Sequence, residues 1–155
     1  MRWPGEGSLK KDDKTNFYSE NRDGNFENGV GFVISENNIL PYVKDLKALN
    51  ERMCYIRITG RIFDLIIINC YAPTEDKRDD IKEDFYEDLD SICDITSNYF
   101  VKIFLGDFNA KIGKEEVYRP TIGRDSLHDT SNDNGTRQIH FCMTNEMVLS
   151  SSVVQ

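Results

Sequence analysis

The middle of the chain contains two apolar runs of strand length, separated by one amphipathic helix. The first run covers Phe63 to Tyr71 and is rich in β-branched residues, which predicts a central strand covered on both faces. Ala72-Pro73-Thr74 ends this run, because proline cannot donate a hydrogen bond to a neighbouring strand. A helix is expected over Asp79 to Ser97, and a second buried strand over Lys102 to Leu105, stopped by Gly106. Strands that alternate with helices in this way predict an α/β or α+β fold in layers.

The predicted helix has one apolar and one acidic face. Its apolar residues recur at spacings of four, four and three, the period of a helix with one buried stripe. They are Ile81, Phe85, Leu89 and Ile92. The segment from Glu75 to Asp94 holds ten acids and three bases, a net charge of −7 in a chain whose formal net charge is −8. We interpret this run as a solvated helix face.

This charge argues against a protein that binds nucleic acids by bulk electrostatic attraction. Outside the acidic segment, however, the chain is close to neutral. That part of the surface could still meet a phosphate backbone, especially through a divalent metal.

Weaker patterns predict the elements nearer the two ends. Met1 to Asn25 is polar and is expected to be loop with one short strand, and Ile39 to Leu49 has no clear pattern. The 109–131 segment is expected to be a long polar loop, of a length that is often functional, followed by helix-capping chemistry at Asn132 to Gly135. The remaining expected strands are Thr15 to Ser19, Gly29 to Ser35, Arg52 to Thr59 and the start of Val148 to Gln155, and the remaining helix is Thr136 to Asn145.

The four cysteines are interpreted as reduced, partly buried thiols. None lies in a C-x-x-C pair, and His140 with Cys142 offers too few ligands for zinc. No apolar run approaches the length of a membrane span, and the first residues lack the apolar region of a secretory signal. The expected location is therefore the nucleus or the cytoplasm.

The residues after the second apolar run could carry chemistry. Gly106 is followed at once by Asp107, Phe108 and Asn109, and ligands often bind at the carboxyl ends of strands in such sheets. Asp107 offers oxygens to a hard cation or a base to a water, and the Asn109 amide can donate to a phosphoryl oxygen. A bare D-x-N pattern is also common in ordinary turns, so the spacing by itself leaves both interpretations open.

The wider motifs resemble the endonuclease/exonuclease/phosphatase family, which includes abasic-site endonucleases, pancreatic-type deoxyribonucleases and endonuclease domains of non-LTR retrotransposons. The resemblance lies in a strand followed by GDFN, in Asn69-Cys70-Tyr71-Ala72-Pro73, and in the length of the helix between them. The segments NGVGFVIS and SNDNGTRQ resemble the retrotransposon branch, which includes the craniofacial development protein 2-like proteins of animals. The resemblance implies a four-layer αββα sandwich, incomplete here, with residues 1–155 forming a single partial domain.

The same resemblance implies a role for each matching residue. Asp107 would orient or deprotonate the attacking water, and Asn109 would bind the scissile phosphate. Tyr71 would place its phenol against the phosphate or the active-site network, although a core aromatic at a strand end is the alternative. Lys111 is a candidate phosphate contact, with a solvated lysine as the alternative. The implied cofactor is Mg²⁺ or Mn²⁺, with Asp107 as a weak ligand, and the implied partner is DNA.

The resemblance also indicates what this chain lacks. In the retrotransposon branch a metal-binding glutamate directly precedes a segment like Met1 to Gly5, and an Asp-His pair follows later than Gln155. Both are therefore expected to lie outside this chain. We expect a divalent-metal-dependent endonuclease domain of retrotransposon origin whose activity in this chain is weak or absent. The alternative is a non-catalytic remnant that acts as a binding module. Unpaired sheet edges would then be sites for partners or self-association.

Overall fold

The computed structural model describes residues 7–11, 14–18, 29–96 and 99–150. The chain divides into two compact units. Unit 1 is Met1–Tyr71 with Ser97–Gly106, and unit 2 is Ala72–Thr96 with Asp107–Gln155. Each unit is described by itself below.

Unit 1 contains a three-stranded antiparallel sheet in the order β1-β2-β3. Its strands are β1 (Gly7–Lys11), β2 (Lys14–Tyr18) and β3 (Gly31–Ser35). The last two agree with the predicted strands to within two residues, although Ser19 lies outside the described residues. The expectation of loop before Thr15 was wrong at β1, which pairs with β2 although its sequence has no alternating apolar pattern.

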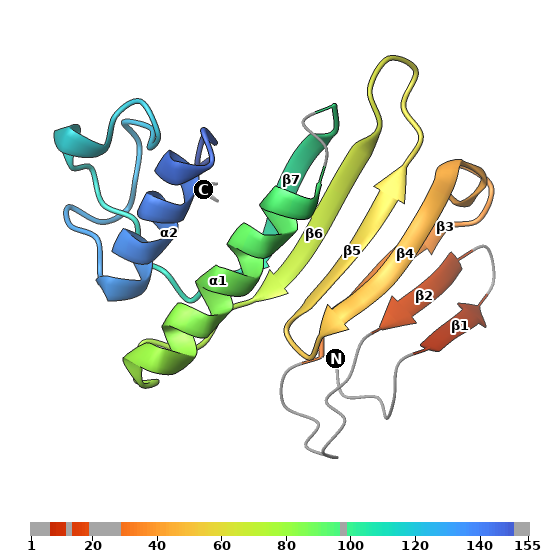
Figure 1. Cartoon of the computed structure of the whole chain (residues 1–155), viewed down its shortest axis with the longest axis horizontal. Helices are drawn as coiled ribbons and strands as arrows, with labels where there is room; N and C mark the ends of the chain where they lie inside the picture. The colour runs from red at the N-terminus through yellow and green to blue at the C-terminus, as the bar shows by residue number, and fades with distance from the viewer. Residues whose placement is uncertain (1–6, 12–13, 19–28, 97–98, 151–155) are drawn as a thin grey trace. The chain divides into compact units, whose positions relative to one another are not determined.

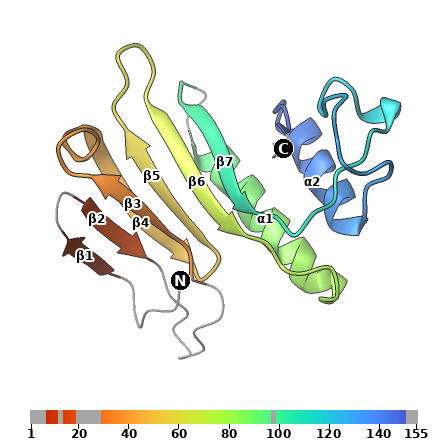
Figure 2. The same cartoon turned by 180° about the vertical axis from the view of Figure 1, so that it is seen from behind.

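A four-stranded sheet in the order β4-β5-β6-β7 completes unit 1 (Figure 1, Figure 2). The strands are β4 (Val43–Asn50), β5 (Met53–Ile58), β6 (Leu65–Tyr71) and β7 (Val101–Asp107). The short helix η1 (Leu40–Tyr42) precedes β4. The first three strands are antiparallel. The Val101 N–H donates to Asp64 O at 2.9 Å, and Gly106 lies against the Cys70 carbonyl, so β6 and β7 run in parallel. The Asn69 amide donates to Gly31 O at 2.7 Å and joins the two sheets.

The predicted burial of the two apolar strands needs correction. In β6, fully buried and half-buried residues alternate, so this strand is not equally covered on both faces. In β7, Val101, Ile103 and Leu105 are 45%, 40% and 41% exposed, although a buried strand was predicted there. The reason is that β7 is the edge strand of its sheet in the described part of the chain, which leaves part of each side chain uncovered. Among the residues of unit 1 whose burial is described, the buried apolar ones are Val30, Ile34, Met53, Cys54, Ile56, Ile66, Ile68 and Cys70.

Unit 2 contains the helices α1 (Asp79–Ile95) and α2 (Asp133–Thr144), with a short helix η2 (Glu116–Tyr118) in the long loop. Both long helices agree with the prediction to within three residues. Most of the predicted stripe of α1 is buried, but Ile81 is 38% exposed while Lys82 is buried. The rings of Tyr86 and Phe141, 6.1 Å apart, bring the two helices together.

The predicted strand at the end of the chain is represented by one bridge, in which Leu149 pairs with Ile122 in parallel. Residues 151–155 of that prediction lie outside the described residues. Among the helices that the structure describes, none is long and apolar enough to cross a lipid bilayer.

Candidate functional site

The loop after β7 brings Asp107 and Asn109 together, as the D-x-N spacing predicts. The Asn109 N–H donates to Asp107 Oδ1 at 2.9 Å, which closes a turn through the aspartate side chain. Asn109 has a φ of 48°, a left-handed conformation that asparagine adopts more readily than most residues. The Ala72 N–H donates to Asp107 O at 2.9 Å, and Asn109 Nδ2 donates to Ala72 O at 2.8 Å. The turn is therefore fixed to the segment that follows β6.

These contacts leave part of each side chain available. Asp107 is exposed, and its carboxylate has a second oxygen beyond the one that accepts the Asn109 N–H. An asparagine amide has two N–H donors, and the contact with Ala72 O engages one of them. A carboxylate acceptor and an amide donor thus lie two residues apart, where the carboxylate can receive a water proton and the amide can donate to an anion.

Lys111 contributes to the site through its backbone. Its N–H donates to Asn132 Oδ1 at 2.9 Å, and its carbonyl accepts from the Asn132 N–H at 3.1 Å. Gly135 is required beside this carbonyl, because a Cβ at that position would lie 2.1 Å from Lys111 O. The side chain of Lys111 belongs to an exposed residue, which fits the solvated alternative as well as a phosphate contact.

Two residues that the sequence analysis did not single out hold this loop in place. Asn134, at 2% exposure, donates from its amide to Pro73 O and to Asn109 O, each at 3.0 Å. Glu75 accepts from Asn132 Nδ2 at 2.7 Å and from the N–H groups of Asp133 and Asn134 at 3.2 Å. The NDNG segment was interpreted as a helix cap, which is correct for Asn132, whose side chain accepts from the Gly135 N–H. Glu75 was counted within the solvated acidic run, because no local pattern shows its partners.

Tyr71 lies in unit 1, whereas Asp107, Asn109 and Lys111 lie in unit 2. It is half-buried at the end of β6, and its N–H donates to Arg52 O at 2.9 Å. The Arg52 guanidinium lies 5.8 Å from the centre of the tyrosine ring, a cation–π distance. Tyr71 therefore has structural partners of its own in unit 1.

The described residues do not form a complete metal site. They include no group of three or more histidine, cysteine, aspartate or glutamate side chains that could hold an ion. Magnesium is commonly bound by one or two carboxylates together with waters and substrate phosphates. Asp107 can supply one such carboxylate, but it does not form a complete site with the described residues.

The cysteines do not add chemistry to the site. All four are free and buried. Burial raises the pKa of Cys54 and Cys70 to about 12 and that of Cys142 to about 11. Thiols with such pKa values stay protonated at neutral pH and are poor nucleophiles and metal ligands.

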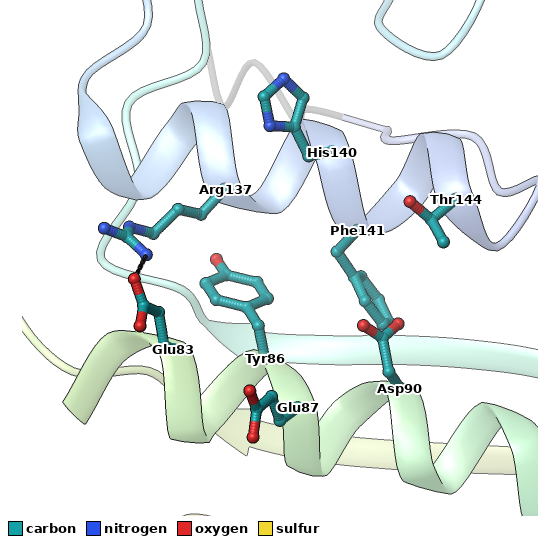
Figure 3. Close-up of a pocket in the computed structure, with 8 residues that line it drawn as sticks. All are labelled: Glu83, Tyr86, Glu87, Asp90, Arg137, His140, Phe141 and Thr144. Carbon is teal, nitrogen blue, oxygen red and sulfur yellow. Dashed lines mark ion pairs between the residues drawn. The ribbon is translucent and has the colours of Figure 1, made fainter. Parts of the chain in front are cut away.

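A separate hollow of about 290 Å³ lies between α1 and α2 (Figure 3). Its lining residues are Glu83, Tyr86, Glu87, Asp90, Arg137, His140, Phe141 and Thr144. Arg137 spans the hollow toward Glu83, with 3.8 Å between Nη1 and Oε1. None of the predicted site residues lines this hollow, so it is not part of the candidate site.

Comparisons with known proteins agree with the fold. No family model matches the chain. Over 155 residues, 100% of its length, it is 32% identical to craniofacial development protein 2 of Bos taurus and to craniofacial development protein 2 of Tragulus javanicus. It spans 26% of the length of each of these relatives. Among solved structures, it resembles the endonuclease domain of TRAS1, a telomere-specific non-LTR retrotransposon, with a TM-score of 0.51 and 12% identity over 84% of this chain and 52% of that chain.

The predicted α/β fold class is confirmed. Among the described residues, the fold is a mixed α/β fold that includes a four-stranded sheet and two long helices, and it resembles the fold of the TRAS1 endonuclease domain. In sequence, the chain is similar over its whole length to craniofacial development protein 2.

Proposed function

We propose that residues 1–155 are part of one divalent-metal-dependent endonuclease domain of retrotransposon origin, which hydrolyses phosphodiester bonds in DNA. The observation that carries this proposal is the turn after β7, which holds the Asp107 carboxylate and the Asn109 amide together in a chain with this fold. The activity of this chain alone is expected to be weak or absent, because Asp107 is one carboxylate and a phosphodiesterase also needs a bound metal and charge stabilisation.

The proposed roles follow from the groups left available in the turn. Asp107 accepts a proton from the attacking water, or orients that water, through a carboxylate oxygen. Asn109 donates its second amide N–H to an oxygen of the scissile phosphate, while Ala72 O fixes the direction of the amide. Tyr71 is proposed to direct its phenol toward the phosphate or the surrounding network, and Lys111 to meet the phosphate backbone. Mg²⁺ or Mn²⁺, with Asp107 as one ligand, would supply Lewis-acid stabilisation of the phosphate charge.

The second candidate function is a non-catalytic binding module. The same hydrogen bonds favour it, because Asp107 and Asn109 already form a complete turn with each other and with Ala72. A chain that kept this turn for its fold would retain the loop without hydrolysing DNA.

The experiment is a plasmid-nicking assay in Mg²⁺ and in Mn²⁺, with a chelated control, on the full chain and on Asp107→Ala and Asn109→Ala. Removal of a general base or of a phosphate donor should lower the nicking rate by about 100-fold or more. Asp129→Ala is the matched control, because Asp129 lies in the same polar loop and pairs with Lys114 at 3.5 Å. Nicking no greater than in the chelated control would exclude activity in this chain.

Binding of a fluorescein-labelled DNA duplex, followed by anisotropy, separates the two candidates. Binding without nicking that is weakened by Asn109→Ala supports the binding module. If the protein shows no nicking and no binding that depends on Asn109, both candidates are excluded.

A further inference from the structure

We propose that Asn134 is a positioning residue that holds Asn109 in its phosphate-binding orientation. This inference rests on the proposed function, because it assigns to the first turn of α2 the task of fixing that site. Asn134 was not singled out in the sequence, and it touches neither a reacting atom nor a metal in the proposed scheme. It acts through the backbone of the residue that does.

The first step of the argument is the position of the Asn134 amide. The residue is 2% exposed, and its Nδ2 donates to Pro73 O and to Asn109 O, each at 3.0 Å. Pro73 belongs to the segment after β6, and Asn109 to the loop after β7. One buried side chain therefore joins two chain segments that no strand ladder connects at this point.

The second step is the chemistry of the two acceptors. Each carbonyl needs a donor, because a buried carbonyl without a partner is destabilising. An asparagine amide has two N–H groups and supplies one to each. Aspartate, nearly the same in shape, has no donor when ionised and would place a negative charge beside two carbonyl oxygens. Position 134 thus depends on a neutral amide rather than on side-chain volume alone.

The third step is how completely Asn109 is fixed. Its N–H is held by Asp107 Oδ1, its carbonyl by Asn134, and its side-chain amide by Ala72 O. Asn134 is itself anchored, since its own N–H, in the first turn of α2, donates to Glu75 Oε2 at 3.2 Å. Without the Asn134 amide, the left-handed backbone at Asn109, φ 48°, loses the contact that restrains its carbonyl. The contact with Ala72 O remains, but the Asn109 amide then sits on a less restrained backbone and should hold its direction less well than in the wild type.

Nuclear magnetic resonance of the full chain tests this geometry without any need for activity. In the wild type, the side-chain NH₂ group of Asn134 should exchange with solvent at least about tenfold more slowly than that of the exposed Asn38, because a buried amide with two acceptors opens rarely. In Asn134→Asp, the side-chain NH₂ signals of Asn109 should shift and their exchange should accelerate. The inference would be overturned if the side-chain NH₂ groups of Asn134 and Asn38 exchanged with solvent at equal rates. It would also be overturned if a folded Asn134→Asp variant left the Asn109 signals unchanged.

The matched control is Asn145→Asp. Asn145 follows α2, and its amide also makes two hydrogen bonds, to Asp90 Oδ1 at 2.7 Å and to Phe141 O at 3.0 Å, but it does not touch the loop. Asn134→Asp should weaken binding of a short labelled DNA duplex by about tenfold more than Asn145→Asp, the loss expected when one hydrogen bond to a charged group is misplaced. If Asn134 had only a structural role, both variants would have a lower melting temperature and similar affinities for DNA. That result would count against the inference.

The resonance experiment and the DNA-binding experiment test the inference and the proposed function separately. If wild-type protein neither binds nor cuts DNA, the proposed function fails, while the resonance experiment still decides whether Asn134 holds Asn109. If Asn134→Asp does not fold, Asn134→Ser, which retains one donor, replaces it, and the exchange rate in the wild type remains decisive.

Discussion

In unit 1, the described strands pair their backbone groups with one another in two sheets. In unit 2, the long loop between β7 and α2 has no such ladder. Besides a few backbone pairs, such as Asn132 N–H with Lys111 O, its backbone groups pair with single polar side chains, among them those of Asn132, Asn134 and Glu115. Glu75 accepts from the neighbouring N–H groups of the first turn of α2. The first arrangement tolerates many sequences, whereas the second requires particular residues at particular positions.

The two units nevertheless have similar apolar cores. Ile68 in unit 1 and Leu89 in unit 2 are both at 0% exposure. Burial of apolar side chains should therefore contribute similarly to the stability of both units, and the difference between the units lies in their polar contacts. Three predictions, in order of decreasing effect, test this view.

Truncation of either core residue should have the largest effect. Ile68→Ala and Leu89→Ala should each lower the free energy of unfolding by about 2–5 kcal/mol, because each removes buried methyl groups and leaves a cavity. Urea unfolding followed by circular dichroism measures this loss. Ile62→Ala is the control, with 80% exposure in the wild type and an expected loss below about 0.5 kcal/mol. A loss below about 1 kcal/mol at only one of the two core sites would show that the cores are not alike.

The same contrast explains what the sequence predicts well. The strands β5 and β6 and both long helices follow from apolar periodicity, which is a local property of the chain. The proximity of Asp107 and Asn109 is also local, because their spacing closes the turn. The exposure of β7 could not be predicted, since it depends on the place of the strand in the sheet.

The partners of Asn134 and Glu75 could not be predicted either. Asn134 contacts Pro73, which is 61 residues away, and Glu75 contacts Asn132, which is 57 residues away. No periodic pattern encodes such pairs, and a single polar residue has the same appearance in a turn, a cap or a solvated face. The part of the candidate site that depends on long-range polar contacts therefore emerges only from the structure.

The second prediction concerns Glu115, whose carboxylate pairs with backbone in the long loop. Its Oε1 accepts from the Ser131 N–H at 2.5 Å, and this hydrogen bond holds the pKa of Glu115 below its ordinary value of 4.5. A lowered pKa in the folded state means that the stabilisation is present above pH 4.5 and is lost as pH falls from there through the folded-state pKa. The melting temperature should therefore fall in acid, and Glu115→Gln should show less of this fall.

Melting curves from neutral pH to about pH 3 measure this effect. Glu116→Gln is the control, because the Glu116 side chain is 89% exposed and its ion pair with Arg119 is long, at 3.8 Å. Glu116→Gln should keep the wild-type pH profile. If Glu115→Gln kept it as well, the loop would not depend on this carboxylate.

The smallest effect is expected at the ion pair between the two helices of unit 2. Lys82 Nζ lies 3.0 Å from Asp133 Oδ2, with the lysine side chain 5% exposed and the aspartate 45% exposed. Asp133 also pairs with Arg137 at 2.8 Å, and Arg137 and Lys82 together hold its pKa below the usual range. Because the aspartate is half in water and keeps Arg137, Lys82→Met should leave no uncompensated buried charge. A double-mutant cycle of Lys82→Met and Asp133→Asn should give a coupling of about 1 kcal/mol or less, reduced by added salt. A coupling above about 2 kcal/mol would mean that charge as well as neutral amides fixes the first turn of α2, and the contrast between the units would then include buried ion pairs.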